Sequence, residues 1–206
     1  LRAQDLSSLP SQGDDLWSGM MQSELADLTE IHQNGTPEKL ADYLRHFGDS
    51  FTWFGGISTA LDGYNRNQET DHVALTYFDK LVCFAESIGV LQVENPESGP
   101  WGEALSHNVD DIVEQIEMEL GIDIAAPLGI IHTDGISIKN GILHYRHINA
   151  LYMATRIAKL NVDRGAIAEI GGGLGLTAMY TQRLCNSKYT IYDLPVICTL
   201  SGHYLM

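Results

Sequence analysis

Residues 166–178 read AIAEIGGGLGLTA, from Ala166 to Ala178, and they decide the fold. A short apolar run passes into a glycine-rich turn and then into residues that can begin a helix, an order that predicts strand, tight loop and helix. Glycines at positions 171, 173 and 175 let the backbone take positive φ and let a ligand approach closely. The N–H groups that open the helix would point toward that ligand.

A second strand is predicted at residues 188–192, where β-forming residues run up to an acid, Asp193. Asp193 follows the glycine loop by about 20 residues, where a second parallel strand presents a carboxylate to a ribose in nucleotide-binding folds. Loop and acid together indicate a β-α-β unit that binds a nucleotide cofactor.

The glycine spacing bears on which cofactor this is. The dinucleotide pattern G-x-G-x-x-G/A is met from Gly173 only with Ala178 in its last position. The pattern E-x-G-x-G-x-G is met directly by Glu169, Gly171, Gly173 and Gly175. That pattern resembles motif I of class I S-adenosylmethionine-dependent methyltransferases. We therefore expect S-adenosyl-L-methionine rather than NAD(P) or FAD.

Composition excludes several other functions. The chain has 206 residues and a formal net charge of −15, with 12 Lys and Arg among 27 acids, so we expect no nucleic-acid partner. No apolar run is long enough for a membrane span, and no secretory leader is visible, so we expect a cytoplasmic protein and no membrane partner. The three cysteines and eight histidines show no metal-ligand spacing, and we predict no metal.

The region before the glycine loop is predicted to be mostly helical. Apolar residues at helical spacing predict helices over residues 15–33, 36–47, 70–87, 108–120 and 142–160. Thr36 and Asn108 are expected as N-caps, with Gly48, Gly89 and Gly121 as terminators. The last helix is expected to bury Ile148, Leu151, Tyr152 and Ile157. A hairpin or an extended loop is expected within residues 126–140.

Two segments of this region differ in composition from the helices around them. Residues 51–67 mix aromatics with glycines and are expected to form either a loop over the site or an aromatic plug between helices. Residues 94–100 are the clearest linker candidate. The domain prediction is a helical region over residues 1–160, followed by the first β-α-β-α part of a Rossmann-like domain over residues 161–206. Since two strands are fewer than such a sheet needs, we expect an incomplete domain and a fragment that is inactive by itself.

A closer resemblance appears once three motifs are combined. The segment GILHYRHINALY at residues 141–152, the loop EIGGG from Glu169 and the triplet DLP from Asp193 resemble a bacterial sugar O-methyltransferase family. The resemblance is specific from about residue 121 onward. It implies an α/β fold, with a helical N-terminal region followed by the truncated start of a Rossmann-like class I methyltransferase domain. Where the family commonly has an aromatic after the third glycine, this chain has Leu174.

The resemblance implies a set of cofactor-binding residues. Glycines of the loop would hold the methionine part, Glu169 would order the loop or meet the amino group, Asp193 would accept from the ribose and Leu194 would pack near the adenine. The complete set is Glu169, Gly171, Gly172, Gly173, Gly175, Asp193 and Leu194.

The general base is not identified by any motif. His144 and His147 are candidates because they fall on neighbouring positions of one helix face before the first strand. More often, a Tyr-Arg-His cluster at a helix start caps the helix or pairs with acids. Tyr145 and Arg146 are substrate-binding candidates, since Arg146 could hold a carboxylate or phosphate.

The sequence thus predicts an S-adenosylmethionine-dependent O-methyltransferase acting on a hydroxyl of a small molecule, with a saccharide as acceptor and a homodimer as a possible assembly. An NAD(P)- or FAD-dependent oxidoreductase and a non-catalytic helical interaction module remain open. Cofactor binding discriminates among the three. The acceptor and the position methylated are left open.

Overall fold

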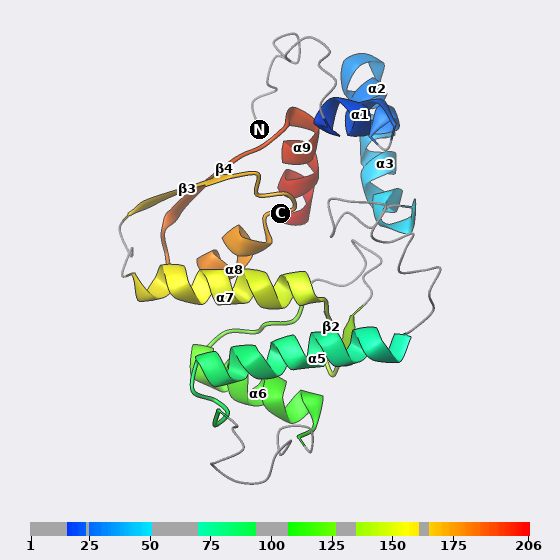
Figure 1. Cartoon of the computed structure of the whole chain (residues 1–206). Helices are drawn as coiled ribbons and strands as arrows, with labels where there is room; N and C mark the ends of the chain where they lie inside the picture. Colours follow the sequence, from blue (N-terminus) through cyan, green and yellow to red (C-terminus); the bar gives the residue numbers. More distant parts are fainter. Residues whose placement is uncertain (1–15, 24, 51–69, 94–106, 127–134, 161–164) are drawn as a thin grey trace.

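The computed structural model in Figure 1 describes residues 16–23, 25–50, 70–93, 107–126, 135–160 and 165–206. These residues form helices and two small sheets, so the fold is mixed α/β. Helix α7, Tyr145–Lys159, lies across the middle. One side of α7 carries α8 (Leu176–Leu184) and the sheet of β3 (Ala166–Ile170) and β4 (Lys188–Tyr192), and the other side carries α5 (Thr70–Ser87) and α6 (Val109–Leu120) (Figure 1).

The first predicted helix is divided in two. It forms α1, Leu16–Gln22, and α2, Ala26–Asn34. The division falls at Ser23, whose hydroxyl donates to the carbonyl of Gly19 at 2.9 Å and competes with the continuing helical pattern. The next helix, α3, spans Pro37–Ser50, so Gly48 lies inside it and the predicted stop at Gly48 was wrong. A glycine ends a helix only where the backbone turns left-handed, and α3 does not turn there.

Helix α6 has the ends that its sequence predicted. The Asn108 side chain accepts a hydrogen bond from the Asp110 N–H at 2.9 Å, and Gly121 closes the helix with φ of 67°. One face buries Ile112, Val113 and Ile116. Helix α5 is likewise followed by a left-handed glycine, Gly89, with φ of 85°.

Replacing Asn108 by alanine removes the side-chain acceptor at the start of α6. We expect the free energy of unfolding to fall by about 1 kcal/mol, the usual loss for an N-cap asparagine. Urea unfolding followed by circular dichroism measures it. Asn108→Asp keeps an acceptor and should retain most of the stability, whereas equal losses in both variants would contradict the capping role.

A hairpin precedes α7. Strands β1, Ile136–Ile138, and β2, Gly141–Leu143, pair antiparallel, with Ile136 opposite Leu143. Of the two alternatives predicted within residues 126–140, a hairpin forms, but it lies later in the chain than expected, because its second strand falls at residues 141–143. Helix α7 begins at Tyr145 rather than at residue 142, because residues 141–143 are used as a strand.

Helix α7 buries a wider arc than the predicted stripe. Ile148 and Leu151 are buried as expected, but Tyr152 is 39% exposed, which corrects that prediction. Because α7 packs against α8 on one side and α5 on the other, residues between the expected positions are enclosed as well. These additional buried residues are His147, Ala150, Ala154 and Thr155.

The C-terminal part is a β-α-β unit. Strands β3 and β4 are parallel, with Glu169 opposite Ile191 and Ile170 opposite Tyr192, and α8 connects them. Helix α9, Pro195–Tyr204, follows β4 and contacts α2. The order strand, loop, helix, strand that the sequence predicted is confirmed. Two parallel strands ending at the same edge bring the glycine loop and Asp193 together.

Buried hydrophobic side chains from α2, α5, α6, α7, α8 and α9 form one cluster, which includes Leu28, Leu81, Ile116, Leu151 and Leu200. This cluster fixes α7 and α8 relative to each other and so positions the glycine loop, which leads from β3 into α8.

None of the helices in the described ranges has the length and hydrophobicity that a bilayer crossing requires. Two predicted segments lie outside the described residues, namely the aromatic loop at 51–67 and the linker at 94–100. The domain boundary at residue 160 stays a prediction.

Candidate functional site

The glycine loop between β3 and α8 has the left-handed backbone that its glycines predicted. Gly171, Gly173 and Gly175 have φ of 72°, 57° and 81°. The loop is anchored at both ends, because the Gly171 N–H donates to the Tyr192 carbonyl at 2.8 Å and the Gly175 N–H donates to the Gly172 carbonyl at 2.9 Å. Ideal Cβ atoms built on Gly171 and Gly173 meet nothing within 4 Å, so the loop presents open backbone at these two positions.

Glu169 lies directly beneath the loop. Its Oε2 accepts a hydrogen bond from the Tyr189 hydroxyl at 3.0 Å. An ideal Cβ on Gly172 would stand 2.9 Å from the same oxygen and 2.8 Å from Cγ2 of Ile191. A side chain at position 172 would therefore force the Glu169 carboxylate and Ile191 to move, and this gives the middle glycine a role that the G-x-G pattern did not explain.

Asp193 is bound to the same loop from β4. Its Oδ2 accepts from the Gly173 N–H at 2.8 Å, and its Oδ1 accepts from the Leu194 N–H at 2.8 Å. One carboxylate therefore holds the glycine loop and the start of α9 together. Since each carboxylate oxygen has two acceptor positions, these bonds leave capacity for the ribose hydroxyls that the sequence predicted as partners.

A pocket of about 270 Å³ opens between the loop and α7. Its lining combines residues of the glycine loop with an acidic residue, Glu169, a basic residue, Arg146, and an amide residue, Asn149. The described residues lining it are Arg146, Asn149, Ala150, Met153, Glu169, Gly171, Gly172, Gly173, Leu174, Leu176 and Thr177. Glu169 and three of the predicted glycines thus share a pocket with Arg146.

The substrate candidates Tyr145 and Arg146 are adjacent and paired. The Arg146 Nε donates to the Tyr145 hydroxyl at 3.0 Å, and its guanidinium carbon lies 5.3 Å from the centre of the tyrosine ring. Arg146 lines the pocket, whereas Tyr145 is not among the described lining residues. Tyr145 therefore orients the arginine, which is the group able to bind a carboxylate or phosphate.

The base candidates His144 and His147 cap α7. His144 Nδ1 accepts from the Arg146 N–H at 3.2 Å, and His147 Nδ1 accepts from the His144 N–H at 3.1 Å. Both side chains are buried, and neither is among the described residues that line the pocket. We expected both rings to face a shared cleft. The structure differs, because reciprocal capping turns the two rings toward the helix backbone. Their role as general bases stays a prediction, and this geometry does not support it.

Burial controls the charge of both histidines. Desolvation first, and then the nearby His147 and Arg146, lower the pKa of His144 to about 3. Desolvation and then Arg183 lower the pKa of His147 to about 4. Both rings are therefore neutral at pH 7, which lets each Nδ1 act as an acceptor.

The remaining predicted cofactor residues, Gly175 and Leu194, are not among the described residues that line the pocket, and neither is Asp193. An ideal Cβ on Gly175 would stand 2.8 Å from Leu205 Cδ1 and 3.0 Å from Ile191 Cδ1. Gly175 is thus buried under neighbouring side chains, and it opens α8 as its N-cap. Leu194 is partly buried and packs against the core cluster. Contact of either residue with a cofactor stays a prediction.

Sequence reasoning missed Asn149, Met153 and Tyr189. Asn149 and Met153 follow Arg146 by one and two helical turns, so they continue one face of α7. Had the face of α7 that carries Arg146 been expected to adjoin the glycine loop, the helical spacing would have identified both residues. Tyr189 lies two residues before Ile191, and only the register of β3 with β4 brings it to Glu169.

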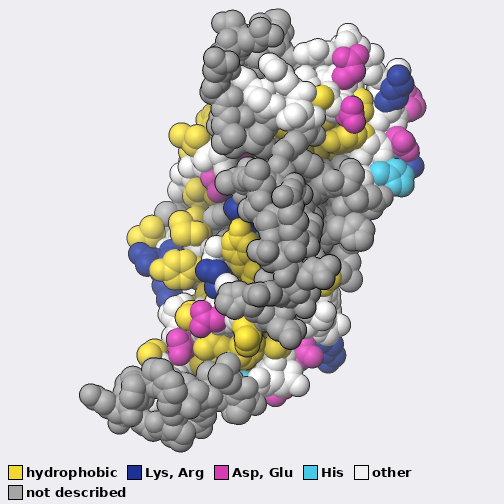
Figure 2. Space-filling view, turned by 45° about the vertical axis from the view of Figure 1, so that its right-hand side comes forward, with side chains coloured by type: hydrophobic (Ala, Val, Ile, Leu, Met, Phe, Trp, Pro, Cys, Tyr) yellow, Lys and Arg dark blue, Asp and Glu magenta, His cyan; other side chains and the backbone are white. Residues whose placement is uncertain are grey.

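No group of three or more histidine, cysteine or acidic side chains suited to a metal occurs among the described residues. The face in Figure 2 shows acidic side chains dispersed among hydrophobic, uncharged and basic ones. The absence of a metal and of a nucleic-acid partner stay predictions.

Replacing Gly172 by alanine places a methyl group against the Glu169 carboxylate and Ile191. We expect the free energy of unfolding to fall by about 1–3 kcal/mol, the range for overpacking a closely packed position. Urea unfolding measures it. Gly19→Ala in α1, where the added Cβ meets nothing within 4 Å, serves as the control and should not destabilise. If Gly172→Ala were as stable as the wild type, Glu169 would not be held in the position described.

Comparison of this sequence with protein-family models gave no match, and neither did comparison with curated proteins or with solved structures. What the chain does must therefore be inferred from its own residues and their geometry.

Proposed function

We propose that this chain is an S-adenosylmethionine-dependent O-methyltransferase whose residues 169–175 and Asp193 bind the cofactor. One observation carries the proposal: an acid and a left-handed glycine loop adjoin a pocket where two parallel strands end. On this proposal the β3-α8-β4 unit is the first part of a Rossmann-like domain. Backbone N–H groups at the start of α8 and the carboxylate of Asp193 supply the polar contacts that a nucleoside requires.

The pocket's charges favour S-adenosylmethionine over a dinucleotide. The amino-acid end of S-adenosylmethionine carries an ammonium and a carboxylate, and Glu169 and Arg146 provide one opposite charge for each within one volume. A dinucleotide presents a pyrophosphate to this loop, and the carboxylate of Glu169 beneath Gly172 would repel it. The volume of about 270 Å³ suits an amino-acid arm better than a pyrophosphate with its second nucleoside.

When bound, this cofactor would supply an electrophilic methyl group for transfer to an acceptor oxygen. The chain's own residues bind and orient. Asp193 holds the loop through Gly173, and Tyr145 holds Arg146 toward the pocket. Fixed orientation is the main contribution that such a transfer needs from the protein. A sugar hydroxyl as acceptor, a homodimer and a cytoplasmic location belong to the same proposal and rest on the sequence resemblance.

Calorimetric titration with S-adenosylhomocysteine, NAD and FAD in parallel tests the proposal. We expect S-adenosylhomocysteine to bind with a micromolar Kd and the dinucleotides to show no binding at the same concentrations. Binding of NAD or FAD alone would favour an oxidoreductase. Absence of binding by all three would favour a helical interaction module.

A further inference from the structure

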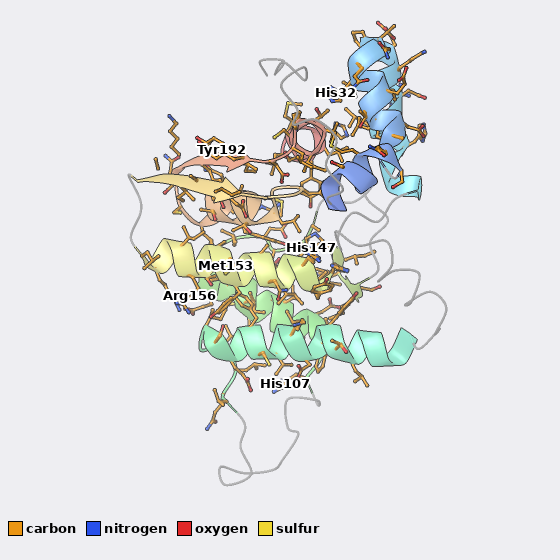
Figure 3. The ribbon with its side chains drawn as sticks, turned by 45° about the horizontal axis from the view of Figure 1, so that its top comes forward. His32, His107, His147, Met153, Arg156 and Tyr192 are labelled. Carbon is orange, nitrogen blue, oxygen red and sulfur yellow. The ribbon has the colours of Figure 1, made fainter. Side chains whose placement is uncertain are left out.

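Tyr189 approaches the site from β4, although its position in the sequence gives no sign of this. In the parallel register Tyr189 stands opposite Ile167, and Glu169 stands opposite Ile191. Tyr189 and Glu169 are therefore diagonal neighbours on the same face of the sheet, a separation that a tyrosine side chain can span. Figure 3 labels Tyr192, three residues later, on the side of the sheet away from α7, as the alternation of side chains along β4 requires.

The contact between them is a hydrogen bond with a fixed direction. The Tyr189 hydroxyl donates to Glu169 Oε2 at 3.0 Å. Burial first, and then the negative charge of Glu169, raise the pKa of Tyr189 well above its usual value. The hydroxyl therefore stays protonated and remains a donor throughout the range in which proteins are stable.

The same carboxylate lies close to the glycine loop. A Cβ at position 172 would stand 2.9 Å from Oε2 of Glu169, so the carboxylate lies next to the space that this glycine leaves free. The hydrogen bond from Tyr189 holds Oε2, and rotation of the carboxylate would break that bond. Glu169 also lines the pocket.

We propose that Tyr189 is a positioning residue that orients the Glu169 carboxylate to receive the ammonium group at the amino-acid end of the ligand. This inference rests on the proposed cofactor. Arg146 lines the pocket from α7 and offers the complementary charge for the ligand's carboxylate. The pair of charges makes the pocket selective for a zwitterionic amino-acid group attached to a nucleoside.

Two ligands separate this role from a merely structural one. S-Adenosylhomocysteine carries the amino-acid group, and 5′-methylthioadenosine has the same nucleoside and thioether without it. Removing one hydrogen bond to a charged group corresponds to roughly tenfold in affinity. We expect Tyr189→Phe to weaken S-adenosylhomocysteine about tenfold by calorimetry and to leave the affinity for 5′-methylthioadenosine within about twofold.

Tyr152→Phe is the matched control. The Tyr152 hydroxyl accepts from Arg156 Nη1 at 3.0 Å, on the exposed side of α7, so this variant also loses a tyrosine hydrogen bond. It should bind both ligands as the wild type does. In a Glu169→Gln background, Tyr189→Phe should change the affinity for S-adenosylhomocysteine by less than about twofold, because the oriented charge is already gone.

The outcomes are distinguishable. Unchanged affinity for S-adenosylhomocysteine in Tyr189→Phe overturns the inference and leaves the proposed function standing. Equal weakening of both ligands overturns it as well, since the tyrosine would then support the whole pocket. A tenfold loss that persists in the Glu169→Gln background contradicts a role through Glu169. If the wild type binds neither ligand, the proposed function itself fails.

Discussion

Asp193→Ala is expected to weaken the binding of S-adenosylhomocysteine roughly a hundredfold. The variant removes the acceptor for the Gly173 N–H and the acceptor for the Leu194 N–H, both at 2.8 Å. Each hydrogen bond to a charged group contributes about 1.5–3 kcal/mol. On the proposed function the variant also leaves the ribose hydroxyls without their partner. A loss of about 3 kcal/mol in binding corresponds to the hundredfold.

Asp123→Ala is the control for this experiment. Asp123 likewise accepts a backbone N–H close in sequence, from Ala125 at 2.8 Å, but it is exposed and, unlike Asp193, has no hydrogen bond to the glycine loop among the described interactions. It should leave the affinity for S-adenosylhomocysteine unchanged. A folded Asp193→Ala variant that binds as tightly as the wild type would remove Asp193 from the cofactor site.

The second large effect is a loss of stability in mild acid. His144 and His147 have pKa values lowered to about 3 and about 4 in the folded chain, against about 6.5 when unfolded. As pH falls, the unfolded chain binds these two protons before the folded chain does. The contribution of the two neutral histidines to the free energy of unfolding is therefore complete above pH 6.5, and it declines as pH falls toward their pKa values in the folded chain. Between pH 6.5 and 5 we expect the two histidines together to lower the free energy of unfolding by about 3 kcal/mol.

His144→Asn tests which group is responsible. Asparagine does not titrate, and it can still accept at the N-cap of α7. The fall in stability between pH 6.5 and 5, measured by urea unfolding, should therefore be about half that of the wild type. His107→Asn, at an exposed position on the other side of the molecule (Figure 3), should keep the whole fall. The same slope in all three proteins would show that neither buried histidine controls it.

The elements that sequence reasoning placed correctly are those with local causes. Asn108 and Gly121 bound α6 as expected, because an N-cap acceptor and a left-handed glycine act within a few residues. The glycine loop follows the same logic, since residues 171, 173 and 175 each take the positive φ that only glycine adopts easily.

The errors concern patterns that do not decide the structure by themselves. Gly48 lies inside α3, although it follows an apolar helical run as Gly121 does, because glycine permits a left-handed turn without requiring one. Tyr152 is exposed because the buried arc of α7 is centred on other residues, including His147, Leu151 and Ala154, and Tyr152 lies outside it. Periodicity does not tell where the neighbouring helices will lie, so the buried face of α7 was predicted in the wrong position.

The residues of the candidate site likewise fall into those that sequence spacing identified and those that only the structure revealed. Glu169, Gly171 and Gly173 were identified by spacing, and they line the pocket. Asp193 was expected to meet only a ligand, but it also holds the loop through the Gly173 N–H. Tyr189 escaped prediction because its partner is 20 residues away and is reached only through strand pairing.

The most direct test of the central claim is a nuclear magnetic resonance titration of protein labelled with ¹⁵N-glycine. On addition of S-adenosylhomocysteine we expect the amide signals of Gly171, Gly172 and Gly173 to shift. The signals of Gly89 and Gly121 should stay in place, because these two share the left-handed backbone but lie outside the pocket. Shifts confined to other glycines, or shifts of the loop with NAD and none with S-adenosylhomocysteine, would contradict the claim that this loop binds S-adenosylmethionine.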